Sequence, residues 1–197
     1  MARRIAHAIL MTTIALTAAG CFSSAPSRFY ILASTATPEG SPTASYAVSV
    51  GPVSIPASVD RPQFVVQVAP NRVELDEFNR WASPLDESIG RAVAGNLVVL
   101  LGTPRVARAP LSNFDPTYRL TIDVQRFESV PGEYVLIEAV WAVQKTGGGE
   151  TRSGRTVARE PVEGKEFDAL AAGHSRAIAK MSSDIAAAIR AEAETKP

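Results

Sequence analysis

The chain has 197 residues, and its 20 Lys and Arg residues balance 20 Asp and Glu residues to a formal net charge of +0. A neutral chain without a basic run has no electrostatic footprint for nucleic acid, so proteins and lipids are the expected partners. A single cysteine excludes an internal disulfide, and we expect one domain stabilised by one packed core.

Three features follow one another at the start of the chain. Arg3 and Arg4 supply positive charge, residues 8–19 are apolar, and small residues precede Cys21. This order is typical of a lipoprotein signal peptide, so residues 1–20 are removed and Cys21 becomes the lipidated first residue. The apolar region is shorter than the about 20 residues that a membrane-spanning helix needs. A thiol that pairs with another molecule is the alternative interpretation of Cys21.

The residues after Cys21 predict where the domain lies. Phe22 stands where an aspartate would retain a lipoprotein at the inner membrane of enteric bacteria, so we expect a lipid-anchored protein on the periplasmic side of the outer membrane. Residues 21–27 form a tether of roughly 20 Å, because an extended chain covers at most about 3.6 Å per residue. The domain, residues 28–197, therefore stays close to its membrane.

In the first half of the domain, aromatic and branched residues favour a strand over 28–32. Residues 33–45 lack an apolar period and predict a flexible surface loop. Alternation predicts a strand over 46–55, and strands 64–68 and 72–75 form a hairpin around Asn71. A helix follows, with Ser83 as its N-cap and Pro84 as its first residue, and it ends at Gly102. Its buried stripe consists of Leu85, Ile89, Val93, Leu97 and Leu100.

In the second half, residues 117–124 alternate between polar and apolar, which predicts a strand at the surface side of a sheet. Residues 134–143 are apolar on both faces and predict a central strand. Three glycines at 147–149 reverse the chain into a strand over 151–159. A long helix over 165–194 closes the fold, and Gly173 predicts a kink or break in it. The fold class is α/β (α+β), a single domain with a mixed, largely antiparallel sheet, one mid-chain helix and a C-terminal helix packed on the sheet.

Catalytic chemistry has few candidate groups in this sequence. After Cys21 the only histidine is His174, expected as a surface or partly packed residue of the last helix. No Cys and His spacing predicts a zinc site, and the triple glycine lacks the lysine and hydroxyl of a phosphate loop. We expect no enzyme activity, no metal and no cofactor beyond the covalent lipid on Cys21. A lipid hydrolase that depends on His174 is an alternative with little chemistry to support it.

Four motifs give the chain a recognisable order: Arg-Phe-Tyr-Ile-Leu at 28–32, Gly-Pro-Val-Ser-Ile-Pro at 51–56, Asp-Arg-Pro-Gln at 60–63 and Asn-Arg-Trp-Ala-Ser-Pro-Leu at 79–85. In this order and spacing the chain resembles the ABC-type transport auxiliary lipoproteins, the family of paraquat-inducible protein C. Val59 stands where the family usually has leucine before the Asp-Arg-Pro turn.

The resemblance implies a mixed α/β fold and a non-catalytic component of a lipid transport system. In such a system an inner-membrane ABC transporter and an MCE-domain periplasmic protein bridge toward the outer membrane, and this chain would be the outer-membrane end. Phospholipid is a candidate partner, while the sequence leaves open which lipid is moved and in which direction. Some family members assemble as homo-oligomeric rings. A structural envelope lipoprotein that binds peptidoglycan or an outer-membrane assembly machine is the alternative function.

Five residues of these motifs are candidates for partner binding, because arginine and tryptophan are frequent anchors of protein interfaces. They are Tyr30, Arg61, Pro62, Arg80 and Trp81. Each also has a structural interpretation. Arg61 and Pro62 fit a solvated turn, Arg80 can cap a carbonyl or pair with Asp76 or Glu77, and Tyr30 and Trp81 fit a hydrophobic core.

Overall fold

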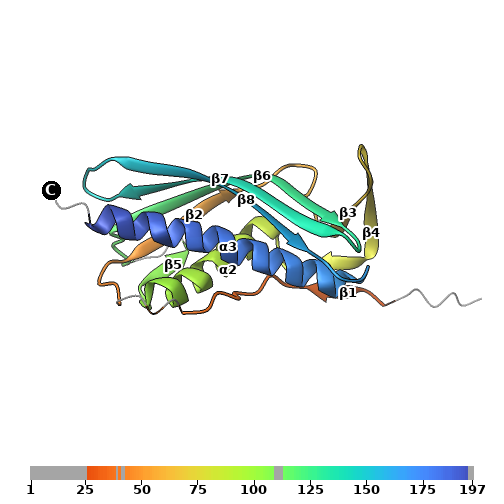
Figure 1. The fold of residues 1–197 in the computed structure, drawn as a ribbon, viewed down its shortest axis with the longest axis horizontal. Coiled ribbons are helices and arrows are strands. Elements are labelled where there is room, and N and C mark those ends of the chain that lie inside the picture. Colours follow the sequence, from red (N-terminus) through yellow and green to blue (C-terminus); the bar gives the residue numbers. More distant parts are fainter. Residues whose placement is uncertain (1–25, 39, 41–42, 109–112, 195–197) are drawn as a thin grey trace, which may run out of the picture.

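A computed structural model describes residues 26–38, 40, 43–108 and 113–194 (Figure 1). These residues form two sheets and two helices. The predicted signal peptide, Cys21 and most of the tether lie outside them. The elements in chain order are β1 (Arg28–Tyr30), β2 (Val48–Ser54), β3 (Gln63–Ala69), β4 (Arg72–Trp81), α2 (Leu85–Leu101), β5 (Val106–Arg108), β6 (Tyr118–Val130), β7 (Tyr134–Lys145), β8 (Thr151–Pro161) and α3 (Phe167–Glu194).

The larger sheet has the strand order β5-β2-β6-β7-β8, and α2 and α3 lie side by side against one of its faces (Figure 1). Strands β6, β7 and β8 form the predicted antiparallel meander, while β2 pairs in parallel with both β5 and β6. The buried residues of β6 alternate as predicted and face the helices. Strand β7, predicted to be central, lies in the interior of the sheet between β6 and the edge strand β8. The middle position belongs to β6, because β2 pairs with its other side.

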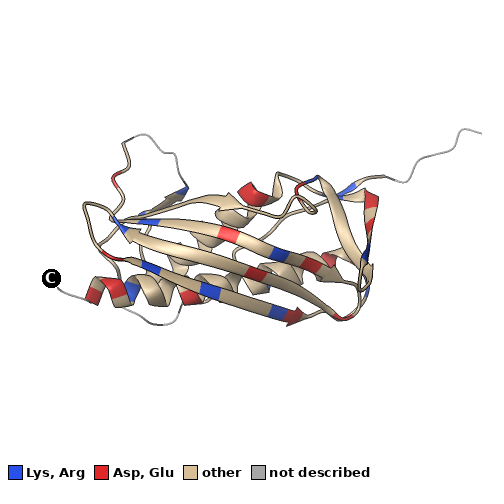
Figure 2. Cartoon of the chain, turned by 90° about the horizontal axis from the view of Figure 1, so that it is seen from above, with Lys and Arg blue, Asp and Glu red and all other residues tan. Residues whose placement is uncertain are grey.

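The outer face of this sheet carries charges of both signs (Figure 2). Glu138 on β7 is only 7% exposed because it lies between arginine side chains from the two neighbouring strands. Its carboxylate accepts hydrogen bonds from Arg155 and from Arg126, the latter at 3.3 Å. The hydrogen bond from Arg155 outweighs burial and, with Arg126, lowers the pKa of Glu138. A local ion-pair network therefore covers this part of the sheet.

Both predicted helices are present, with small differences at their ends. Helix α2 begins at Leu85, and its N-cap is Pro84 instead of Ser83, without a side-chain capping bond. It ends as predicted at Gly102, which has a left-handed φ of 62°. Helix α3 begins at Phe167 and runs unbroken through Gly173 to Glu194, so a break of the helix at Gly173 is wrong.

Gly173 instead permits close packing between α3 and the larger sheet. A Cβ atom at this position would lie 3.0 Å from Cγ2 of Val135 and 2.9 Å from Cγ2 of Val162. Both distances are shorter than an ordinary van der Waals contact between carbon atoms. The absence of a side chain therefore lets the helix approach the sheet.

Residues 33–36 are bonded to both helices, so the flexible surface loop predicted there is wrong for this part. The N–H groups of Thr35 and Ala36 both donate to Oδ1 of Asn96, at 2.9 and 3.0 Å. The N–H of Ala33 donates to the Ser175 hydroxyl at 3.1 Å. Asn96 is fully buried, and its side-chain amide also donates to Ser182 on α3. A polar residue inside the core thus fixes a segment that pairs with none of the described strands.

The smaller sheet has the order β1-β4-β3, so the single sheet expected from the sequence is two. The hairpin of β3 and β4 is present as predicted, but β4 continues to Trp81. Strand β1 ends at Tyr30, earlier than predicted, and pairs in parallel with the end of β4. This sheet stands at one end of the molecule.

Candidate functional site

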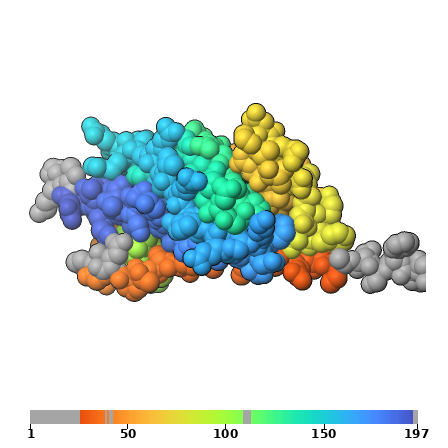
Figure 3. Space-filling view, turned by 45° about the vertical axis from the view of Figure 1, so that its right-hand side comes forward, coloured from red at the N-terminus to blue at the C-terminus, as the bar shows by residue number. Residues whose placement is uncertain are grey.

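The hairpin of β3 and β4 rises from the body as a ridge (Figures 1 and 3). Two open grooves lie between the hairpin and β6, and they share the lining residues Gln67, Pro70, Arg126 and Glu128. One groove, of about 720 Å³, separates the hairpin tip from the turn between β6 and β7, and its lining includes Val68, Pro70, Arg126, Tyr134 and Lys165. The other, of about 280 Å³, is lined by residues that include Pro56, Val59, Val65, Val73 and Phe127.

A bulge in β4 shapes the base of the hairpin. Gln63 on β3 pairs with Arg80, whereas the next residue, Phe64, pairs with Asp76. Residues 77–79 are therefore extra residues on β4, and such an insertion bends a strand and redirects its side chains.

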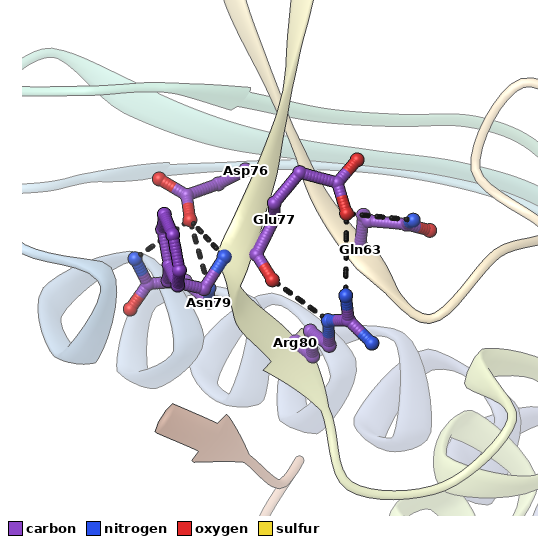
Figure 4. Close-up of polar contacts among 6 residues, drawn as sticks. Gln63, Asp76, Glu77, Asn79 and Arg80 are labelled. Carbon is purple, nitrogen blue, oxygen red and sulfur yellow. Dashed lines mark hydrogen bonds and ion pairs between the residues drawn. The ribbon is translucent and has the colours of Figure 1, made fainter. Parts of the chain in front are cut away.

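The carboxylate of Asp76 organises one half of this bulge (Figure 4). Its Oδ1 accepts the N–H of Phe78 at 2.9 Å, the N–H of Asn79 at 2.8 Å and the side-chain amide of Asn79 at 3.0 Å. Burial raises the pKa of the Asp76 carboxyl, but these hydrogen bonds together outweigh it and leave that pKa below its usual value. Asp76 is thus a carboxylate at neutral pH.

Arg80 closes the other half of the bulge (Figure 4). Its Nε donates to the carbonyl oxygen of Glu77 at 2.8 Å, and its guanidinium lies 3.2 Å from the Glu77 carboxylate. Gln63 donates to the same carboxylate oxygen at 3.3 Å. The structural interpretation of Arg80 is confirmed: it caps a carbonyl and pairs with Glu77, while Asp76 bonds elsewhere.

Tyr30 and Trp81 lie beneath the hairpin, 7% and 5% exposed. The Trp81 ring stacks on Phe64 with centroids 4.3 Å apart, and Tyr30 meets Phe64 edge-on at 5.7 Å. The Tyr30 hydroxyl donates to Oδ1 of Asn79 at 2.7 Å, which ties β1 to the bulge. The core interpretation of both residues is confirmed, and their rings support the hairpin from below.

Arg61 and Pro62 form the exposed turn that leads into β3. The Pro62 carbonyl accepts the N–H of Trp81 at 2.8 Å, so the turn is fastened to the end of β4. No side-chain hydrogen bond or ion pair joins the Arg61 guanidinium to another part of the described chain. The smaller sheet thus brings all five candidates together, with Arg61 and Arg80 toward solvent and the rings of Tyr30 and Trp81 inside.

Sequence reasoning missed the exposed apolar residues of the hairpin. They are Val68, Val73, Leu75 and Phe78, exposed by 38%, 54%, 42% and 45%. Alternating apolar residues usually indicate a face that packs on a core, and only the structure shows that none of the described elements covers these side chains. A group of exposed apolar residues on a ridge is typical of a contact surface.

His174 is fully buried, so the prediction of a surface or partly packed residue is wrong. Its Nε2 lies 2.8 Å from the Ser129 hydroxyl. Burial lowers the pKa of His174 to about 3, and the ring is neutral at physiological pH. A serine nucleophile needs an accessible hydroxyl and a histidine oriented by a third group. Ser129 is 2% exposed, and Nδ1 of His174 has no hydrogen-bond partner in the described part of the chain, so this pair is a feature of the core.

These features define a mixed α/β domain whose accessible parts are an apolar ridge and two grooves. The chain belongs to the family of ABC-type transport auxiliary lipoprotein components, whose family model matches residues 30–186. The match confirms the family expected from the motifs. No helix in the described ranges has the length and apolar character needed to cross a bilayer.

Two crystal structures share the fold. Protein XCC0632 from Xanthomonas campestris, of the DUF330 family, has a TM-score of 0.71 at 20% identity, over 86% of this chain and 100% of that one. An uncharacterized protein has a TM-score of 0.68 at 21% identity, over 84% of this chain and 99% of that one. No curated protein matches the sequence significantly. At such identities the likeness shows the fold alone.

Proposed function

We propose that this protein is a non-catalytic outer-membrane lipoprotein of an MCE- and ABC-type lipid transport system, and that its hairpin docks the MCE-domain conduit at the outer membrane. Family membership makes the chain an auxiliary component of ABC-type transport. The observation that carries the proposal is the ridge of β3 and β4, which presents Val73, Leu75 and Phe78 to solvent. Exposed apolar groups of this kind mark protein contacts.

The base of the ridge is preorganised for binding. Asp76 and Arg80 close the bulge by hydrogen bonds, and the rings of Tyr30 and Trp81 fill the space beneath it. A surface that is rigid before binding loses little conformational freedom on binding. Arg61 supplies an exposed guanidinium at the rim, where a carboxylate of the partner can pair with it. Pro62 holds the turn against the end of β4, because its carbonyl oxygen accepts the N–H of Trp81.

Co-purification of the full-length acylated protein with the MCE-domain protein of the same cell tests this proposal. The variants Leu75→Arg and Arg61→Glu change exposed side chains, and Val157→Arg on β8 is the matched control because Val157 is 52% exposed outside the hairpin. We expect the first two to reduce recovery of the partner by about tenfold, as for the loss of an interface anchor. Equal recovery with all three variants would overturn the docking role.

Metabolic labelling with palmitate tests the anchor separately. We expect label in the wild-type protein and none in Cys21→Ser, which should also leave the outer-membrane fraction. Label in both proteins, or outer-membrane retention of the unlabelled variant, would contradict anchoring through Cys21.

A further inference from the structure

Phe29 and Ile31 are the most exposed large apolar residues in the described part of the chain, at 65% and 67%. Tyr30 lies between them and Leu32 follows Ile31, and each is only 7% exposed. The chain therefore alternates between an outward and an inward face. Strand β1 is an edge strand of the smaller sheet, and among the described residues no further strand lies beyond it. A phenylalanine and an isoleucine thus share one open face.

The position of this face along the chain indicates what covers it. Arg28 begins β1 seven residues after Cys21. The six residues between them span roughly 20 Å when extended, so a lipid on Cys21 keeps β1 nearer to the bilayer than a longer linker would. Among the described residues β1 is the first element of the fold (Figure 1). Phe29 belongs to this strand and Ile31 follows it directly, so the apolar pair lies close to the tether.

We infer that the outward face of residues 28–31, at β1 and directly after it, is a second membrane contact, in which Phe29 and Ile31 enter the interfacial region of the bilayer that holds the acyl chains. This inference rests on the proposed lipidation of Cys21. Aromatic and aliphatic side chains partition into this region together with a lipid anchor. Arg28 beside Phe29 is exposed and can meet lipid phosphates.

The contact also fixes the orientation of the domain. Strand β1 and the tip of the hairpin lie on opposite sides of the molecule in Figures 1 and 3. With β1 on the membrane, the hairpin points away from the bilayer. An acyl tether alone would let the domain tumble, whereas a second contact holds the ridge toward the periplasm.

Spin labels on the full-length acylated protein test the inference. The acylated protein has no free thiol, because Cys21 is its only cysteine and carries the lipid. One label is placed at Ile31→Cys and the control label at Val157→Cys, which is exposed on β8. Each protein is reconstituted into vesicles of phosphatidylethanolamine and phosphatidylglycerol, and collisions with oxygen and with a water-soluble nickel chelate are measured by electron paramagnetic resonance.

We expect the label at position 31 to collide more with oxygen and several-fold less with the nickel chelate than the label at position 157. Equal access of both labels to the chelate would overturn the inference. Protection that disappears when the protein is diluted with excess lipid would identify a second copy as the cover and would also overturn it. If the anchor itself is absent, the protein does not float with the vesicles, and this outcome is distinct from a floating protein whose label at 31 stays in water.

Discussion

The imidazole of His174 lies flat on the ring of Phe127, with ring centroids 3.8 Å apart and planes inclined by 6°. The Trp81 ring meets both rings edge-on, so this stack joins α3 and β6 to the base of the hairpin. A histidine in such a place is a neutral aromatic residue, because burial disfavours its charged form.

The burial of His174 predicts a loss of stability in acid. Its pKa is about 3 in the folded protein against an ordinary value of 6.5, so below pH 6.5 the unfolded chain binds a proton that the folded chain does not. The free energy of unfolding should therefore fall as the pH drops from about 6.5 toward about 3, by up to roughly 4 kcal/mol. Urea unfolding at a series of pH values measures this change.

The variant His174→Gln serves as the control for this titration, since it cannot be protonated. It should lose less stability than the wild type between pH 6.5 and 5. Both proteins should still lose stability at lower pH, where Asp76 and Glu138, whose pKa values are lowered in the fold, become protonated. The same pH profile for both proteins between pH 6.5 and 5 would show that His174 is not the group responsible.

Gly154 on β8 leaves room for the ring of Trp141. The two residues are paired across β7 and β8, and a Cβ atom at 154 would lie less than 3.0 Å from three atoms of the indole ring. Trp141 donates to Thr156 at 3.2 Å, so its ring cannot move without losing that bond. We expect Gly154→Ala to destabilise the fold by about 1 to 3 kcal/mol, as overpacking does. In urea denaturation, Ser153→Ala should remain within about 0.5 kcal/mol of wild type, and an equally small effect of Gly154→Ala would contradict the packing described.

Asn96 holds the extended segment after β1. Replacing it with leucine leaves the N–H groups of Thr35 and Ala36 without their acceptor, which should cost about 2 to 4 kcal/mol. Hydrogen exchange should accelerate at these two amides before it does in α3. Ser182→Ala removes one partner of the same side chain and should cost about 1 kcal/mol. If Asn96→Leu had the same free energy of unfolding as Ser182→Ala, Asn96 would not have the bridging role assigned to it.

Asp76→Ala should loosen the bulge while leaving the larger sheet intact. The amides of Phe78 and Asn79 lose their acceptor, so their hydrogen exchange should accelerate, and recovery of the MCE-domain partner should decrease. The expected loss of stability is about 1 kcal/mol, because the site is close to solvent. Glu74→Ala, on the same exposed strand, is the matched control. Unchanged exchange at both amides in Asp76→Ala would contradict the proposed clamp.

Local signals explain which parts of the fold the sequence could predict. The apolar stripe and Gly102 identify α2, and short turns identify the hairpin and the meander, because each signal lies within one segment. The parallel pairings of β2 with β6 and of β1 with β4 join distant segments without a turn. They depend on the tertiary packing, which no local pattern records.

The same difference between local signals and contacts of distant segments applies to the candidate site. The pairing of Arg80 with Glu77 was one of two partners suggested by sequence proximity, and the burial of Tyr30 and Trp81 follows from their size and apolar character. The exposure of Val73 and Leu75 could not be predicted, since it depends on which elements leave that face uncovered. The burial of His174 likewise depends on its contact with Ser129, 45 residues away in the sequence.

The docking role of the hairpin has a direct test in living cells. A photo-crosslinking amino acid is placed at Leu75 on the ridge or, as control, at Val157 on β8, in the full-length protein. The account predicts a crosslink to the MCE-domain protein from position 75 and none from position 157. A crosslink from neither position, or equal crosslinks from both, would contradict the claim that this ridge holds the transport conduit at the outer membrane.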